Sequence, residues 1–201
     1  MKQQLKELIK NPFDYVAGIK SLLIGIAIIL ATAVLGFFSQ THLNGVLDVH
    51  IGKEANLLFT FIIEGITDWL CMAIVLYSGG LLISKSKIRL IDVFGTQALA
   101  REPMLIVVLL SLPISQQHVD QYLEWKLLGV GDAVSVAGYE FALFGLFVLG
   151  TIAATIWMVS LMYKAFSVSC NVKGTKAITA FIVGIIMAEA LSKYLLFILH
   201  I

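Results

Sequence analysis

Long stretches of apolar residues dominate the hydropathy pattern of this 201-residue chain. A helix that rises about 1.5 Å per residue needs roughly 20 residues to cross the hydrocarbon core of a bilayer. Five segments fit that requirement, and we place spans at about residues 21–38, 57–83, 97–115, 136–162 and 177–199. The pattern therefore predicts an all-α fold, a polytopic transmembrane helix bundle with five spans.

Composition supports a protein that is embedded in a membrane. Hydrophobic residues make up 59% of the chain and charged residues 13%, whereas a soluble domain averages about 25% charged residues. The connections are too short to fold as a separate catalytic domain. We expect one membrane domain over residues 21–201, preceded by a cytoplasmic segment over residues 1–20. The net charge of +1 excludes a strongly basic nucleic-acid-binding protein.

The beginning of the chain combines a short amphipathic stretch with the first span. Leu5, Leu8 and Ile9 have helical spacing, which predicts either an amphipathic helix on the cytoplasmic membrane surface or a solvated helical stub. The first apolar stretch has no A-x-A-like site after it and exceeds the roughly 15 residues of the longest signal-peptide cores. We interpret it as a retained anchor.

Basic residues alternate between rich and poor segments. The N-terminal segment and the four connections, with the residues that border them, hold 4, 1, 4, 1 and 3 lysines or arginines in turn. Cytoplasmic segments near span ends retain positive charge. The alternation predicts that the N-terminus lies inside and the C-terminus outside.

Four ionisable residues lie within the predicted second and fifth spans. Glu64 and Asp68 are one helical turn apart, and so are Glu189 and Lys193. Each buried charge requires a partner, a cavity or a proton. Since three carboxylates face one ammonium group, we expect these residues to form an intramembrane polar cluster in which at least one carboxyl is neutral.

Two interpretations of this cluster remain open. In the structural one, Lys193 bridges the second and fifth helices and fixes their register, so that Lys193→Met destabilises the bundle. In the functional one, the cluster is a proton or cation pathway that opens to the outside. Transporter cores typically contain broken helices, and Pro103, near Arg101 and Glu102, is the candidate for such a break.

Two further groups of residues are expected near or within the spans. Arg101 and Glu102, at the start of the third span, are predicted to form a pair at the inner membrane interface. In the fifth span, small residues recur every fourth position and predict a close-packing stripe, which would place that helix at the centre of the bundle: Ala180, Gly184, Ala188 and Ser192.

Motifs for enzymatic chemistry are weak or incomplete. Residues 84–87 match S-x-x-K without its companion elements, and residues 129–131 begin a glycine-rich loop that does not continue. We expect surface positions for the four histidines, His42, His50, His118 and His200, and no metal site. The two cysteines, Cys71 and Cys170, are not expected to pair. We therefore expect a protein that is not an enzyme and has no cofactor.

Three strings resemble bacterial members of the Yip1 family, which are integral membrane proteins. They are the proline-containing entry to the third span, residues 98–103, the exit of the fourth span, residues 156–166, and the basic turn at residues 173–176. The resemblance implies five spans after a short cytoplasmic N-terminus and a location in the bacterial cytoplasmic membrane. It also implies a scaffold or adaptor that acts on other membrane components and has no catalytic residues. A membrane-protein partner or self-association is expected, and a small proton- or cation-coupled permease is the alternative.

Overall fold

The computed structural model of the chain describes residues 11–52, 57–114, 121–122, 124–130 and 138–199. Helices dominate this part, and it contains five helical segments long and apolar enough to span a membrane. The expectations for residues 1–10, His118 and His200 lie outside the described residues. These helices confirm the predicted membrane class and, within the described residues, the predicted count of five spans.

Four of the five spans are unbroken helices. They are α2 (Ile19–Ser39), α3 (Leu58–Ile83), α7 (Gly138–Ser169) and α8 (Gly174–Ile198). The predicted ends agree with α2, α3 and α8 to within three residues. The predicted end of the fourth span was too early, because α7 continues through the polar residues that follow Met162 and ends seven residues later.

The third span consists of two short helices and was predicted too late in the chain. Helices α4 (Leu90–Leu99) and α5 (Pro103–Ser111) together form a 22-residue candidate span. Pro103 has no backbone N–H to donate, and it begins α5 at a position where a helix tolerates proline. Residues 100–102 form a turn between the two helices, so that Arg101 lies near the middle of the span and not at its start.

A small antiparallel hairpin and two short helical segments complete the described chain. Strands β1 (Thr41–His42) and β2 (His50–Ile51) pair in the connection between α2 and α3. The one-turn helix η1 (Pro12–Asp14) precedes α2, and the π-helical segment η2 (Glu124–Leu128) lies between α5 and α7. The strands are a minor exception to the predicted all-α class, and they bring polar residues over one end of the bundle.

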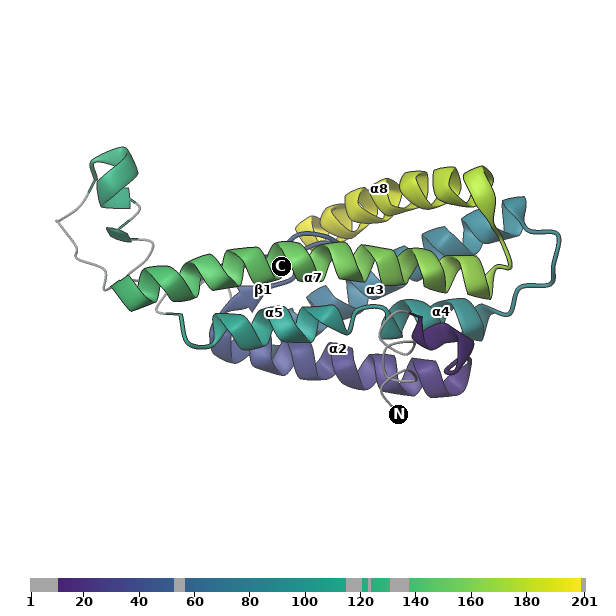
Figure 1. The fold of residues 1–201 in the computed structure, drawn as a ribbon, viewed down its shortest axis with the longest axis horizontal. Coiled ribbons are helices and arrows are strands. Elements are labelled where there is room, and N and C mark those ends of the chain that lie inside the picture. The colour runs from purple at the N-terminus through teal and green to yellow at the C-terminus, as the bar shows by residue number, and fades with distance from the viewer. Residues whose placement is uncertain (1–10, 53–56, 115–120, 123, 131–137, 200–201) are drawn as a thin grey trace.

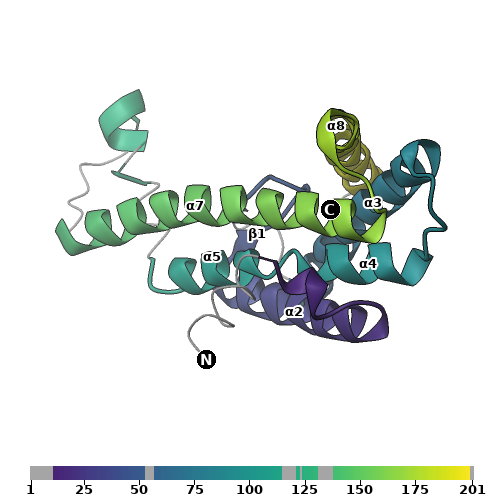
Figure 2. The same cartoon turned by 45° about the vertical axis from the view of Figure 1, so that its right-hand side comes forward.

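The helices run alternately up and down along one long axis (Figure 1). Figure 2 shows α8 beside α3, and α4 and α5 in line with each other between α2 and α7. The third span is the most buried, with 67% of its most apolar stretch covered, against 28% for α8. The expectation that the fifth helix is central is therefore wrong, and the broken third span holds that position.

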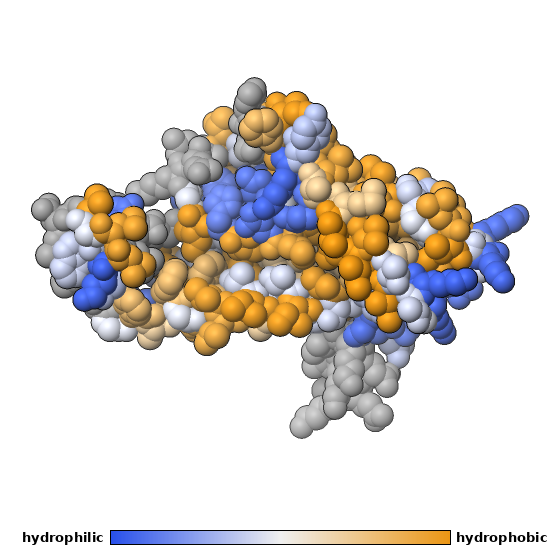
Figure 3. All heavy atoms as spheres, turned by 90° about the horizontal axis from the view of Figure 1, so that it is seen from above, coloured by the Kyte–Doolittle hydropathy of each residue, from blue (hydrophilic) through white to orange (hydrophobic). Residues whose placement is uncertain are grey.

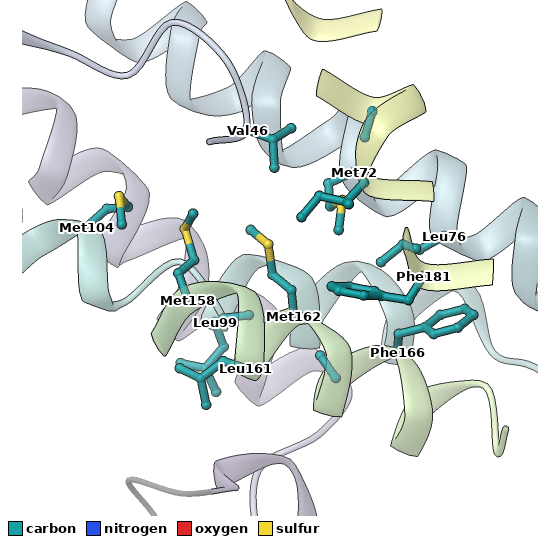
Figure 4. Packing of buried hydrophobic residues seen from close by; sticks show 14 of the residues in the cluster. Val46, Met72, Leu76, Leu99, Met104, Met158, Leu161, Met162, Phe166 and Phe181 are labelled. Carbon is teal, nitrogen blue, oxygen red and sulfur yellow. The ribbon is translucent and has the colours of Figure 1, made fainter. Parts of the chain in front are cut away.

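Close helix contacts depend on small residues. A Cβ atom at Gly25 of α2 would come within 2.5 Å of the backbone of α4, so only glycine permits this approach. Trp69 of α3 donates a hydrogen bond to the Phe94 carbonyl of α4 (2.9 Å). Figure 4 shows Met158 and Met162 of α7 among the apolar side chains of the other helices.

The outer surface has the pattern expected of a membrane protein. In Figure 3 apolar residues cover much of the face shown, and hydrophilic residues lie at one end and in a patch nearer the middle of the molecule. The C-terminal ends of α3 and α7 lie at the same end of the bundle (Figure 1), where Asn171 donates a hydrogen bond to Ser86 (2.9 Å). The exposed basic residues nearby are Lys20, Lys85, Lys87, Arg89, Lys173 and Lys176.

Candidate functional site: a buried polar network

An ion pair lies in the interior of the bundle and joins three of its elements. Arg101, in the turn between α4 and α5, places Nη2 3.2 Å from Oδ2 of Asp68 on α3. Ser192 of α8 donates a short hydrogen bond to the other carboxylate oxygen of Asp68. The Asp68 and Arg101 side chains are 0% and 4% exposed, so the pair is shielded from solvent and from lipid alike.

The interruption of the third span places Arg101 at this depth. A charged residue near the middle of a span requires a partner within the protein. The turn at residues 100–102 separates Arg101 from the regular helical face and leaves its side chain beside α3. Asp68 lies one turn after Glu64 on the same helix, so α3 carries both buried acids.

The second buried acid pairs with a histidine from the hairpin. Nδ1 of His42 on β1 lies 2.7 Å from Oε1 of Glu64, and both side chains are at most 3% exposed. The His42 ring stacks on Phe61 (4.3 Å between centroids) and on His50 (5.2 Å). The hairpin is further fixed by Thr41, which donates a hydrogen bond to Ser111 of α5 (2.7 Å).

A small cavity lies next to both ion pairs. Its polar walls are Thr32, Thr41, Glu64 and Arg101. Among the described residues, Nη1 of Arg101, Oγ1 of Thr32 and Nε2 of His42 are buried polar atoms without a hydrogen-bond partner. Such atoms are rare in folded proteins, because burial without a partner costs about 1–3 kcal/mol each.

A third polar group lies at the surface of the hairpin and α8. Nζ of Lys193 is 2.7 Å from Asp48 and 3.4 Å from Glu189, and its side chain is 49% exposed. The amide of Leu47 donates a hydrogen bond to the Glu189 carboxylate (2.9 Å). Gly45 has φ of +140°, and a Cβ atom there would lie 2.6 Å from Glu189, so the loop requires glycine to enclose this carboxylate.

The structure divides the predicted intramembrane cluster into separate groups. Glu64 and Asp68 are buried as expected, but neither contacts Lys193 in any described ion pair. Lys193 and Glu189 do form the expected pair one turn apart, at the edge of the bundle. The bridge that Lys193 was expected to make from α8 to α3 is made instead by Ser192, the preceding residue.

The predicted inner-interface pair is also corrected. Arg101 is buried against Asp68, because the third span begins at Leu90 and carries Arg101 into the interior. Glu102 is half-buried beside it. The predicted surface position of His42 is wrong for a related reason, since the hairpin folds over the bundle and returns His42 to α3.

The small-residue stripe of the fifth span faces α3 along most of its length. Gly184, Ala188 and Ser192 are buried, and Ala180 is half-buried. A Cβ atom at Gly184 would lie 2.8 Å from a methyl group of Leu76. Cys71 and Cys170 are free, buried thiols. They do not pair with each other, as predicted.

Sequence reasoning missed His42 and misassigned Arg101. The one available signal was charge balance. Two acids in the second span require two cationic or hydrogen-bonding partners, and Arg101 is, with Lys193, one of the two basic residues inside the predicted spans. His42 lies in a connection of mixed polar and apolar residues, whose pattern gives no indication that the histidine is buried.

The chemistry open to this network is proton binding and charge pairing. Imidazole and carboxyl groups can each bind or release a proton, whereas the guanidinium group of arginine stays charged. Within the described residues, no group of three or more histidine, cysteine or acidic side chains is arranged to hold a metal ion.

Comparison with known proteins gives no relative. No protein-family model, no curated protein and no solved structure matches the chain.

Proposed function

We propose that this protein is an integral membrane scaffold or adaptor of the Yip1 type, which acts through contacts with other membrane components and performs no catalysis. One observation carries the proposal: each buried acid of α3, and Glu189 of α8, pairs with a group on another element. These pairs link the hairpin, α3, the α4–α5 turn and α8. A bundle held in one arrangement presents a fixed surface to its neighbours.

Helix α7 is the surface that we assign to such contacts. Only 17% of its most apolar stretch is covered, the lowest share among the five spans. Its 32 residues correspond to about 48 Å at the usual rise per residue, which exceeds the thickness of the hydrocarbon core. Leu149 and Ile156 are 69% and 64% exposed on it. A partner membrane protein or a second copy of the chain would cover this face.

Site-specific photo-crosslinking tests the proposal. A photoreactive amino acid replaces Leu149 or Ile156 on α7 in cells, and the matched control replaces Leu23, which is 62% exposed on α2. The proposal is supported if both α7 positions give the same near-stoichiometric crosslinked protein species and position 23 gives no such species. Equal crosslinking to lipid alone from all three positions would contradict an adaptor surface on α7.

A second candidate function, a small proton- or cation-coupled permease, is favoured by the broken third span. Discontinuous helices with charged residues at the break occur at substrate and ion sites of transporters, and Arg101 occupies such a break beside Asp68 and Glu64. In this proposal the two buried acids bind the coupling ion.

Proton flux into liposomes separates the two candidates. Glu64→Gln preserves side-chain size and should abolish flux in a permease. Because it also removes one member of the buried pair with His42 and so lowers stability, flux is compared per amount of folded protein. Glu124→Gln, an exposed acid of η2, is the control. The absence of wild-type flux, together with a specific α7 crosslink, supports the scaffold.

We further propose that the bilayer is a bacterial cytoplasmic membrane, with the N-terminus inside and the C-terminus outside. The orientation is supported by the exposed basic residues, which gather at the end where α2, α4 and α8 begin, and the choice of membrane by the resemblance to bacterial Yip1 proteins.

A further inference from the structure

The small cavity beside the two buried ion pairs has mixed walls. Helix α2, the hairpin, α3 and the α4–α5 segment all contribute to it. Most of its lining is apolar, with side chains such as Ile29, Phe61 and Met104, but Thr32, Glu64 and Arg101 also face it. A purely apolar cavity of this size would remain dry, whereas polar groups give a solvent molecule something to bind.

Two of these polar residues have atoms without a partner. Oγ1 of Thr32 and Nη1 of Arg101 are buried without a hydrogen bond among the described residues, and their residues are 4% and 3% exposed. Glu64 has one oxygen engaged with His42 at 2.7 Å and the other only with the distant amide of Leu43, at 3.4 Å. The cavity thus has a free donor, a free hydroxyl and a carboxylate with spare acceptor capacity.

We propose that this cavity binds one ordered water molecule. The water accepts a hydrogen bond from Nη1 of Arg101, donates one to the Glu64 carboxylate and makes a third with the Thr32 hydroxyl. The cavity has room for about one water molecule, and buried waters typically make about three hydrogen bonds. Both its size and its hydrogen-bonding groups therefore fit water.

The charges on the cavity walls make an ion a less favourable occupant than water. An anion would face the Glu64 carboxylate, and a cation would face the Arg101 guanidinium, each at short range in an interior of low dielectric constant. Water is neutral, and it both donates and accepts hydrogen bonds. The opposite charges of the two walls therefore favour water over either kind of ion.

The bound water connects two ion pairs that otherwise lack a described contact. The resulting hydrogen-bonded chain runs from His42 through Glu64, the water and Arg101 to Asp68 and Ser192. This inference holds for a scaffold and for a proton-coupled permease alike, because a bound water is compatible with proton binding by the buried acids, whereas it argues against a metal cation at Glu64.

X-ray radiolytic footprinting in nanodiscs tests the proposal. Hydroxyl radicals formed from a bound water oxidise a neighbouring methionine to its sulfoxide, which mass spectrometry detects. Met104 lines the cavity, whereas Met162 is equally buried and does not. We expect oxidation of Met104 in the native protein and none of Met162.

A pair of matched variants locates the water. Thr32→Leu fills the cavity with an apolar side chain and should abolish oxidation of Met104. The control is Thr151→Leu. Thr151 is also a helical threonine whose buried hydroxyl lacks a partner among the described residues, but it does not line the cavity. This variant should leave the oxidation of Met104 unchanged. Variants are compared only if they retain a cooperative melting transition. If neither variant folds, the oxidation of Met104 relative to Met162 in the native protein still decides whether the cavity holds water.

Several results would overturn the proposal. One is an unoxidised Met104 in the native protein, which would indicate a dry cavity. The others are oxidation that persists in a folded Thr32→Leu protein, which would place the water elsewhere, and equal oxidation of Met104 and Met162.

Discussion

At the residue scale, Arg101 and Lys193 illustrate how burial decides the value of an ion pair. Arg101 pairs with Asp68 where both side chains are almost fully covered, and Lys193 pairs with Asp48 at a half-exposed position. Removing one member of a buried pair leaves an uncompensated charge, which costs about 3–5 kcal/mol. An exposed pair typically contributes less than about 1 kcal/mol.

We therefore predict that Arg101→Gln lowers the free energy of unfolding by about 3–5 kcal/mol, whereas Lys193→Gln lowers it by less than about 1 kcal/mol. This order reverses the expectation from the sequence that Lys193 is the critical cation. Equilibrium unfolding in mixed micelles measures both values. A larger loss for Lys193→Gln than for Arg101→Gln would disprove the assignment of Asp68 to Arg101.

Cys170 provides a second prediction at this scale. The thiol follows α7 and is fully buried, and burial raises the pKa of Cys170 from 9.0 to about 12. The thiolate is the reactive form of cysteine, so at pH 8 the folded protein contains almost none at this position. In a Cys71→Ser background, iodoacetamide should leave Cys170 unmodified until the protein unfolds.

The control for this experiment is Lys87→Cys, added in a Cys71→Ser/Cys170→Ser background. Residue 87 is exposed at the same end of the bundle, and its thiol should react with iodoacetamide in the folded protein as fast as after unfolding. Equally fast alkylation of Cys170 in the folded protein would show that the end of α7 opens.

At the element scale, unbroken apolar helices were predictable and the broken one was not. The ends of α2, α3 and α8 agree with the hydropathy pattern because polar residues flank a long, predominantly apolar stretch at both ends. In the third span the unbroken apolar core begins at Met104, because Gln97, Arg101 and Glu102 reduce the hydropathy before it. The predicted start at about residue 97 came from extending this core backward to the length of a span. The actual start at Leu90 depends on α3, which supplies the partner for Arg101.

The contact between α8 and α3 yields a prediction for the small-residue stripe. Gly184→Leu should lower the free energy of unfolding by about 1–3 kcal/mol, the usual cost of overpacking. The reason is that even a Cβ atom added at residue 184 would lie only 2.8 Å from a methyl group of Leu76. Gly79→Leu on α3 is the matched control, since a Cβ atom there meets no atom within 4 Å. Thermal melting measures both, and equal melting temperatures would show that α8 adjusts freely.

At the scale of the whole molecule, charge pairing depends on contacts that local patterns do not contain. The sequence indicated that Glu64 and Asp68 need partners, because both lie inside an apolar span. It did not identify those partners, since Arg101 is 33 residues from Asp68 and His42 belongs to a connection that appeared solvent-exposed. Both partners become evident only when the hairpin and the α4–α5 turn are placed against α3.

Orientation in the bilayer is the property of the whole molecule that charge distribution predicts. Exposed lysines and arginines gather at the end where α3 and α7 terminate, and such residues are retained on the cytoplasmic side. In a cysteine-free background, Lys87→Cys and Lys173→Cys should react with a membrane-impermeant maleimide only after the membrane is opened. Glu124→Cys, on η2 near the opposite ends of α5 and α7, should react in intact cells. Labelling of all three cysteines from the same side would contradict an odd number of spans between residues 87 and 124. Labelling of residues 87 and 173, but not of residue 124, in intact cells would place the basic end outside.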